Sequence, residues 1–260
     1  RLSFEAGGVV FIVNSDGTDL RQVTWSGTSF RPSWLPDGNR IAFDWLSPQG
    51  PIVSSIYVVS ADGSNPHPLC PSDSAGRREC DWLPHGGSFL HLRYDPRPSI
   101  FLSDTATCSG FRLTQANASD LDPTYSPSGA QVAFTRLSVP PPQIWVMNAD
   151  GSGQRQVTTQ GGEHPSWSPD GGTIVYTRSD FTQFCPEQGV LWTVNVATRQ
   201  EKQLLQPWPS QCAVLAGGSG WDDTIDQAIR EVPSHLRVQR PGYLRFAALP
   251  GFLGGATIVA

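Results

Sequence analysis

HPSWSPDGGTIVYTR, residues His164 to Arg178, is the stretch of sequence that decides the fold. An Asp-Gly pair between apolar runs favours a tight β-hairpin, because both central residues of that turn adopt positive φ. Three other segments share its aromatic fourth residue, Pro sixth and Gly eighth: RPSWLPDGNRIAFDW from Arg31, ECDWLPHGGSFLHLR from Glu79 and DPTYSPSGAQVAFTR from Asp122. Their starts lie 48, 43 and 42 residues apart, so the chain is a repeat protein.

A second repeated motif fills the gaps between these hairpins. Its copies are VFIVNSDGTDLRQVT (10–24), IYVVSADGSNPHPLC (56–70), IFLSDTATCSGFRLT (100–114), IWVMNADGSGQRQVT (144–158) and LWTVNVATRQEKQLL (191–205). Each reads as two short strands around a turn. Together the two motifs give a unit of four antiparallel strands, A to D, which is typical of a β-propeller blade.

An aromatic residue ends each A strand, and we expect it to fill the wedge between neighbouring blades. Because it repeats with the unit, packing explains it better than a ligand-stacking platform does. The four residues are Trp34, Trp82, Tyr125 and Trp167.

The chain ends predict how the ring closes. Residues 1–5, RLSFE, align with strand B, so the first blade lacks an A strand, and ATIVA at 256–260 is placed to supply it. We therefore expect one all-β domain over 1–260, a six-bladed propeller closed by its two terminal strands. The blades are predicted at 1–24 plus 256–260, 31–70, 79–114, 122–158, 164–205 and, in degenerate form, 211–250. A short amphipathic helix is expected near 222–232. Five blades remain the alternative.

The two motifs resemble the repeats of the TolB family of β-propellers, most specifically at 144–158 and 164–178. The resemblance covers about residues 1–205. It implies a six-bladed propeller in an exported setting, usually acting as a binding platform. A fold does not decide a function, which depends on the residues of the site.

Composition limits the partners. The net charge is −5, which does not favour binding to the negatively charged phosphate backbone of a nucleic acid. We therefore expect no nucleic-acid binding. No run of eighteen apolar residues occurs, so we expect no transmembrane span; the uncharged tail 246–260 is too short. We expect a periplasmic or extracellular protein whose protein partners include a membrane-associated complex.

The five cysteines contain no C-x-x-C pair. In a propeller, the A–B and C–D turns lie on one face and the longer B–C and D–A connections lie on the other. On this basis we predict disulfides Cys70–Cys80 and Cys185–Cys212, each clamping a long loop, with Cys108 left over and buried. Buried thiols in a cytosolic protein are the alternative.

The long-loop face is also where we expect binding. The first residue of each A strand should ring the mouth of the central channel there: Arg31, Glu79, Asp122 and His164, with Gln211 at the same position of the degenerate unit. Such a ring could hold a polar ligand or a cation, or it could simply be solvated strand ends. The segment LSVPPP at 137–142 and the tail 246–260 are further candidate contact surfaces.

No catalytic, metal or cofactor signature is present. The five His residues lack metal-ligand spacing, and GGSGW at 217–221 has the wrong register for a nucleophile elbow. We therefore favour a non-enzymatic scaffold or accessory subunit. The alternative is a carbohydrate-active lyase or hydrolase, or the gating domain of a peptidase, that uses the channel mouth.

Overall fold

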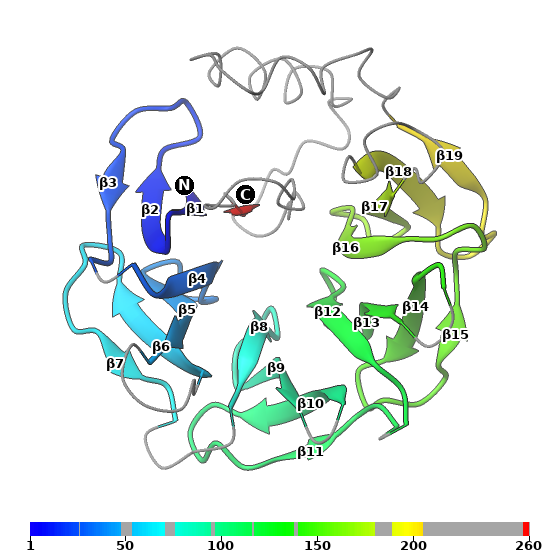
Figure 1. Ribbon diagram of the computed structural model, residues 1–260, viewed down its shortest axis with the longest axis horizontal. Coiled ribbons are helices and arrows are strands. Elements are labelled where there is room, and N and C mark those ends of the chain that lie inside the picture. Colours follow the sequence, from blue (N-terminus) through cyan, green and yellow to red (C-terminus); the bar gives the residue numbers. More distant parts are fainter. Residues whose placement is uncertain are drawn as a thin grey trace.

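The computed structural model describes residues 1–25, 27–47, 54–70, 76–94, 97–115, 117–137, 140–179, 189–204 and 257–259. These residues form five four-stranded antiparallel sheets placed around a central axis (Figure 1). The predicted all-β propeller of four-stranded blades is thus confirmed. The sixth blade predicted at 211–250 and the helix near 222–232 lie outside the described residues.

Each sheet is one blade, with its A strand innermost and its D strand outermost (Figure 1). Blade 1 has the order β20-β1-β2-β3, and the other four blades follow chain order outwards. Blade 1 comprises β20 (Thr257–Val259), β1 (Leu2–Ala6), β2 (Val9–Val13) and β3 (Arg21–Gln22). Blade 2 comprises β4 (Ser29–Trp34), β5 (Arg40–Leu46), β6 (Ser54–Ser60) and β7 (His67–Pro68).

The remaining blades repeat this arrangement. Blade 3 comprises β8 (Arg78–Trp82), β9 (Ser88–Tyr94), β10 (Pro98–Asp104) and β11 (Gly110–Arg112). Blade 4 comprises β12 (Asp120–Tyr125), β13 (Gln131–Arg136), β14 (Gln143–Asn148) and β15 (Arg155–Gln156). Blade 5 comprises β16 (Glu163–Trp167), β17 (Thr173–Ser179), β18 (Gly189–Asn195) and β19 (Glu201–Gln203).

The two ends of the chain meet in blade 1, as the sequence predicts. β20 pairs antiparallel with β1, with Ser3 opposite Val259, Phe4 opposite Ile258 and Glu5 opposite Thr257. β1 and β20 lie side by side on the inner side of blade 1 (Figure 1). The terminal strand therefore covers the inner edge of β1, which would otherwise expose unpaired backbone groups.

Apolar clusters lie at the seams between blades. Trp34 of β4 packs in one cluster with Val10 and Ile12 of the preceding blade. Trp167 likewise joins a cluster with Ile144 and Val146 of blade 4. All four repeated aromatic residues are buried, Trp34, Trp82, Tyr125 and Trp167. The packing interpretation of these residues is confirmed, because each lies in an apolar cluster that contains residues of two neighbouring blades.

A threonine at the end of the second motif fixes the outer strand. The hydroxyl of Thr24 accepts a hydrogen bond from the Val10 amide at 2.9 Å. Thr114 and Thr158 accept equivalent bonds from the amides of Ile100 and Ile144, at 3.0 and 2.9 Å. Blade 2 has Cys70 at this position.

The disulfide predicted between Cys70 and Cys80 is wrong, because Cys70 is bonded to Cys108. Cys80 lies on β8 and is buried in the apolar cluster between blades 2 and 3. The prediction failed because it assigned Cys108 to the far face of the molecule. Cys185 and Cys212 lie outside the described residues.

The Cys70–Cys108 pairing follows from the way in which neighbouring blades pack against each other. In blades 2 and 4 the C–D turn packs against the end of strand D in the preceding blade. Thus a Cβ on Gly151 would lie 2.9 Å from the Leu113 carbonyl oxygen, and one on Gly63 would lie 3.4 Å from that of Val23. Cys108 occupies the C–D turn of blade 3 and therefore meets the end of β7, where Cys70 lies.

We expect Trp82→Ala to lower the free energy of unfolding by about 3–5 kcal/mol, because it leaves a cavity at a blade seam. Chemical denaturation followed by circular dichroism measures this loss. The matched control is Trp25→Ala, since Trp25 is 69% exposed and its removal should change stability by no more than about 0.5 kcal/mol. Equal losses in the two variants would contradict the seam assignment.

Candidate functional site

The residues predicted to ring the channel mouth share an unusual backbone conformation. Arg31, Glu79, Asp122 and His164 all have positive φ, between 50° and 55°. At each of them the pairing of strand A with strand B shifts register, as in a β-bulge. The bulge takes the residue out of the regular ladder. Its backbone N–H therefore needs an acceptor from elsewhere.

Strand B of the preceding blade provides that acceptor. The Glu79 amide donates to the Asp44 carboxylate, at 3.0 Å to Oδ1, and the His164 amide donates to Thr135 Oγ1 at 3.1 Å. Leu92 holds the equivalent position in blade 3 and has no side-chain acceptor. There the Asp122 amide donates instead to Oε2 of Glu79, at 3.1 Å.

Side-chain contacts extend these bonds into a continuous chain around the mouth. The Arg31 guanidinium lies 3.1 Å from the Glu79 carboxylate and 3.5 Å from that of Asp44. On the other side of Glu79, Thr135 Oγ1 donates to Asp122 Oδ2 at 3.0 Å. We name the connected set the mouth ring: Arg31, Asp44, Glu79, Asp122, Thr135 and His164.

The structure thus brings all four predicted residues into one network. His164 lies at the end of this network, with its Nδ1 3.2 Å from Thr177 Oγ1. Its Nε2 lies 3.9 Å from Asp122 Oδ2, which is an ion pair only if the imidazole is protonated. Binding of a ligand there stays a prediction, and Gln211 lies outside the described residues. Asp44 and Thr135 were missed by the sequence analysis, although both occupy the fourteenth position of the hairpin motif.

Burial and neighbouring charges together set the pKa values of Asp44 and Arg31 in the mouth ring. Burial raises the pKa of Asp44 to about 7; Arg31 opposes the shift and Glu79 adds to it. For Arg31, burial alone would lower the pKa. The carboxylates of Glu79, Asp44 and Asp122 outweigh burial, so its pKa lies above the ordinary value. Arg31 stays charged as a result, while Asp44 can change protonation near neutral pH.

Apolar side chains lie beside the ring on the same face. The residue that follows the hairpin motif at the end of strand B is Leu46, Tyr94 or Leu137 in blades 2, 3 and 4. Tyr94 is 51% exposed and Leu137 is 37% exposed. Burial raises the pKa of Tyr94, and the charge of Glu79 adds to this shift. We call the mouth ring together with Leu46, Tyr94 and Leu137 the mouth face.

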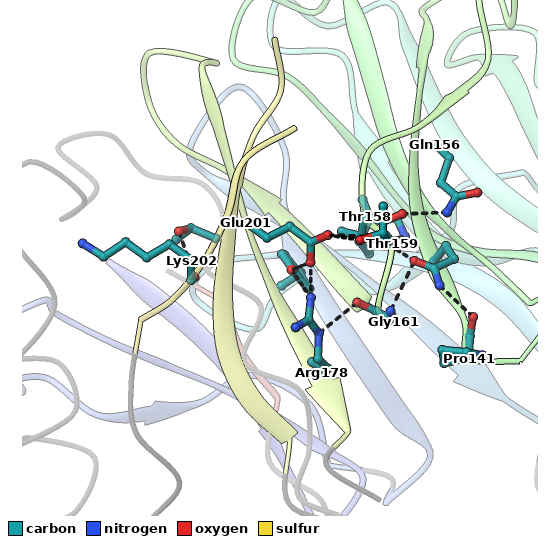
Figure 2. Close-up of polar contacts among 12 residues, drawn as sticks. Pro141, Gln156, Thr158, Thr159, Gly161, Arg178, Glu201 and Lys202 are labelled. Atoms are coloured by element: carbon teal, nitrogen blue, oxygen red, sulfur yellow. Dashed lines mark hydrogen bonds and ion pairs between the residues drawn. The ribbon is translucent and has the colours of Figure 1, made fainter. Parts of the chain in front are cut away.

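A second polar cluster joins blades 4 and 5 (Figure 2). Oε1 of Glu201 accepts bonds from the amide and hydroxyl of Thr159, both at 2.9 Å. Its Oε2 accepts from the Tyr176 hydroxyl at 2.7 Å and pairs with the Arg178 guanidinium. Although burial raises the pKa of Glu201, these hydrogen bonds lower it below its usual range. Both oxygens are engaged, so Glu201 ties the D–A connection to blade 5.

Tertiary contacts also create a serine–histidine pair that the sequence did not reveal. Ser103 Oγ lies 2.9 Å from His91 Nε2, and Arg77 Nη1 donates to the same hydroxyl at 3.1 Å. Such a pair could activate a nucleophile if substrate reached it. However, the exposed fractions are 2% for Ser103 and 0% for His91, which argues for a structural role.

Among the residues that the structure describes, no group of three His, Cys, Asp or Glu side chains is arranged to hold a metal ion. Nor does any described helix have the length and apolar character needed to cross a membrane.

These features define a β-propeller in which the bulged starts of the A strands carry a connected set of charged and polar side chains. The family model described as the TolB beta propeller domain matches residues 79–208, half of the chain. The chain belongs to the TolB β-propeller family.

Individual proteins agree with this assignment. The Tol-Pal system protein TolB of Anaeromyxobacter dehalogenans is 47% identical over 108 residues, which are 40% of this chain and 24% of that protein. The crystal structure of TolB from Acinetobacter baumannii superposes with a TM-score of 0.66 at 19% identity, covering 78% of this chain and 52% of that one. An oligogalacturonate lyase in complex with manganese shares the fold, with a TM-score of 0.55 at 16% identity, covering 75% of this chain and 58% of the lyase.

The chain spans less than half the length of the curated relatives it matches. The likeness to the solved structures, at under 25% identity, concerns the fold alone.

We expect Asp44→Asn to flatten the dependence of stability on pH. The folded pKa of Asp44 is about 7 and its ordinary value is 3.8, so the folded state holds a proton that the unfolded state releases. Stability therefore falls as pH rises through this window, by up to about 1.4 kcal/mol per pH unit. Urea denaturation at several pH values between 5 and 8 gives the free energy of unfolding at each pH. The decrease of this free energy with rising pH should be smaller in the variant than in the native chain.

Asp16→Asn is the control, because hydrogen bonds from Thr18 lower the pKa of Asp16 and it titrates below this pH range. A native slope in Asp44→Asn, or an equal change in Asp16→Asn, would show that Asp44 does not titrate near neutrality.

Proposed function

We propose that this chain is the propeller of a non-enzymatic, exported protein that binds another protein through its mouth face. The observation that carries the proposal is the pairing of exposed apolar side chains, Tyr94 and Leu137, with a charged ring fixed by bulged strands. Protein interfaces combine aromatic anchors with polar groups in this way. A rigid scaffold also lowers the entropy lost on binding.

The charges favour one kind of partner segment. The mouth ring contains three carboxylates, Asp44, Glu79 and Asp122, against the single guanidinium of Arg31. A segment that presents a basic side chain next to apolar residues complements this face. The base would lie toward Asp122, whose side chain is 13% exposed, because Asp44 and Glu79 are buried, and the apolar groups would lie toward Tyr94 and Leu137.

Two observations support the proposed cellular location. A relative bears the name of a Tol-Pal system protein, which supports a role in an envelope assembly. The Cys70–Cys108 disulfide supports an oxidising compartment, because such bonds form and persist mainly outside the cytosol. We therefore infer a periplasmic location, with partners in a membrane-associated complex.

The alternative is an enzyme acting at the channel mouth, favoured by the shared fold of the oligogalacturonate lyase. The ring carboxylates argue against it. Asp44 and Glu79 already accept backbone N–H groups and pair with Arg31, which leaves them committed to holding neighbouring blades together. A catalytic acid or base needs to reach the substrate instead.

The test is capture of the partner from the native source, followed by affinity measurements. We expect Tyr94→Ala and Leu137→Ala each to weaken binding by about tenfold, as loss of an apolar anchor does. Phe111→Ala is the matched control, because Phe111 is 56% exposed on the outer strand β11, and it should bind normally. Equal weakening by the control, or recovery of a lone monomer that turns over a glycan or a peptide, would refute the proposal.

A further inference from the structure

The Cys70–Cys108 disulfide stands where three other blades have a threonine hydrogen bond. In blades 1, 3 and 4 a threonine ends the second motif and accepts a bond from strand C of its own blade. Cys70 stands at this position in blade 2 and is bonded to the C–D turn of blade 3. A contact that elsewhere tightens one blade is here a covalent link between two blades.

The bridged turn anchors the segment that leads into the mouth ring. The backbone carbonyl of Cys108 accepts a bond from Arg77 Nη2 at 2.8 Å. Arg77 is 8% exposed, and its Nη1 also donates to Ser103 Oγ at 3.1 Å. The next residue, Arg78, donates from Nε to Ser54 Oγ of blade 2 at 2.7 Å. Glu79 follows directly and carries the bonds to Asp44, Arg31 and Asp122.

The bridge lies closer to the surface than the remaining described cysteine. Cys70 and Cys108 are both half-buried, whereas Cys80 is 1% exposed inside the core cluster. Thiol–disulfide exchange requires access of the attacking thiolate to a sulfur atom of the bridge. The Cys70–Cys108 bridge satisfies this requirement better than a bond to Cys80 would.

We propose that Cys70–Cys108 is a redox latch on the mouth ring. A dithiol donor supplies two electrons and two protons, so the S–S bond breaks, Cys70 and Cys108 become thiols and the donor becomes a disulfide. The C–D turn of blade 3 is then no longer held against β7. Arg77 loses a fixed acceptor, and the start of β8, with Glu79, opens more often. Regulation of partner binding by this latch rests on the function proposed above, but the opening of β8 does not.

Amide hydrogen exchange on the full chain, followed by mass spectrometry, tests the latch without a partner. With dithiothreitol as the probe, the amides of residues 77–82 should exchange roughly tenfold faster or more, as expected for a lowered local opening free energy. The Cys185→Ser/Cys212→Ser variant should respond like the native chain. In Cys70→Thr/Cys108→Ser, exchange at 77–82 should be the same with and without dithiothreitol.

Two results would overturn the latch. One is faster exchange next to Cys70 and Cys108 with no change at 77–82, which would make the bridge a local brace. The other is an equal acceleration in every blade, which would mean a general loss of stability. Failure to find a protein partner would refute the proposed function and leave this measurement unaffected.

Discussion

The seam between neighbouring blades is the constraint on which the structure depends. A single twisted sheet of four short strands cannot cover both of its own faces, so each blade is completed by the next. The aromatic residue at the end of strand A buries itself among side chains of the preceding blade, as Trp34 does beside Val10. Closure by β20 applies the same logic at the chain ends, since it gives β1 the inner strand that its own hairpin lacks.

The mouth ring is a consequence of the same seam. Each complete A strand has a bulge with positive φ near its start. The N–H group at the bulge needs a hydrogen-bond acceptor, which is a side chain of the previous blade or of the preceding ring residue. Asp44 and Thr135 serve this purpose in two blades, while Glu79 serves it where Leu92 cannot. Charged and polar side chains therefore gather at the starts of the A strands for a structural reason, which is to satisfy the N–H groups that the bulges expose.

Seams differ in how their outer parts are secured. Blades 4 and 5 are joined by Glu201, whose two oxygens bind Thr159, Tyr176 and Arg178. Blades 2 and 3 are joined by the disulfide and by Arg77. The first seam depends on charge and hydrogen bonds, and the second also on a covalent bond that responds to redox conditions. The same repeat can thus form seams that depend on different kinds of bond and respond to different conditions.

The sequence alone determined the features that follow from repetition. The period, the four strands of a blade, the aromatic wedges, the pairing of 257–259 with β1 and the common position of Arg31, Glu79, Asp122 and His164 all follow, because equivalent positions of a repeat occupy equivalent places. Tertiary structure decided which residues meet across a seam. Strand twist carries the outer end of one blade onto the C–D turn of the next, so Cys70 met Cys108 instead of Cys80 and the ring gained Asp44 and Thr135. Spacing along the chain does not encode that lean, which depends on the three-dimensional packing of two twisted sheets.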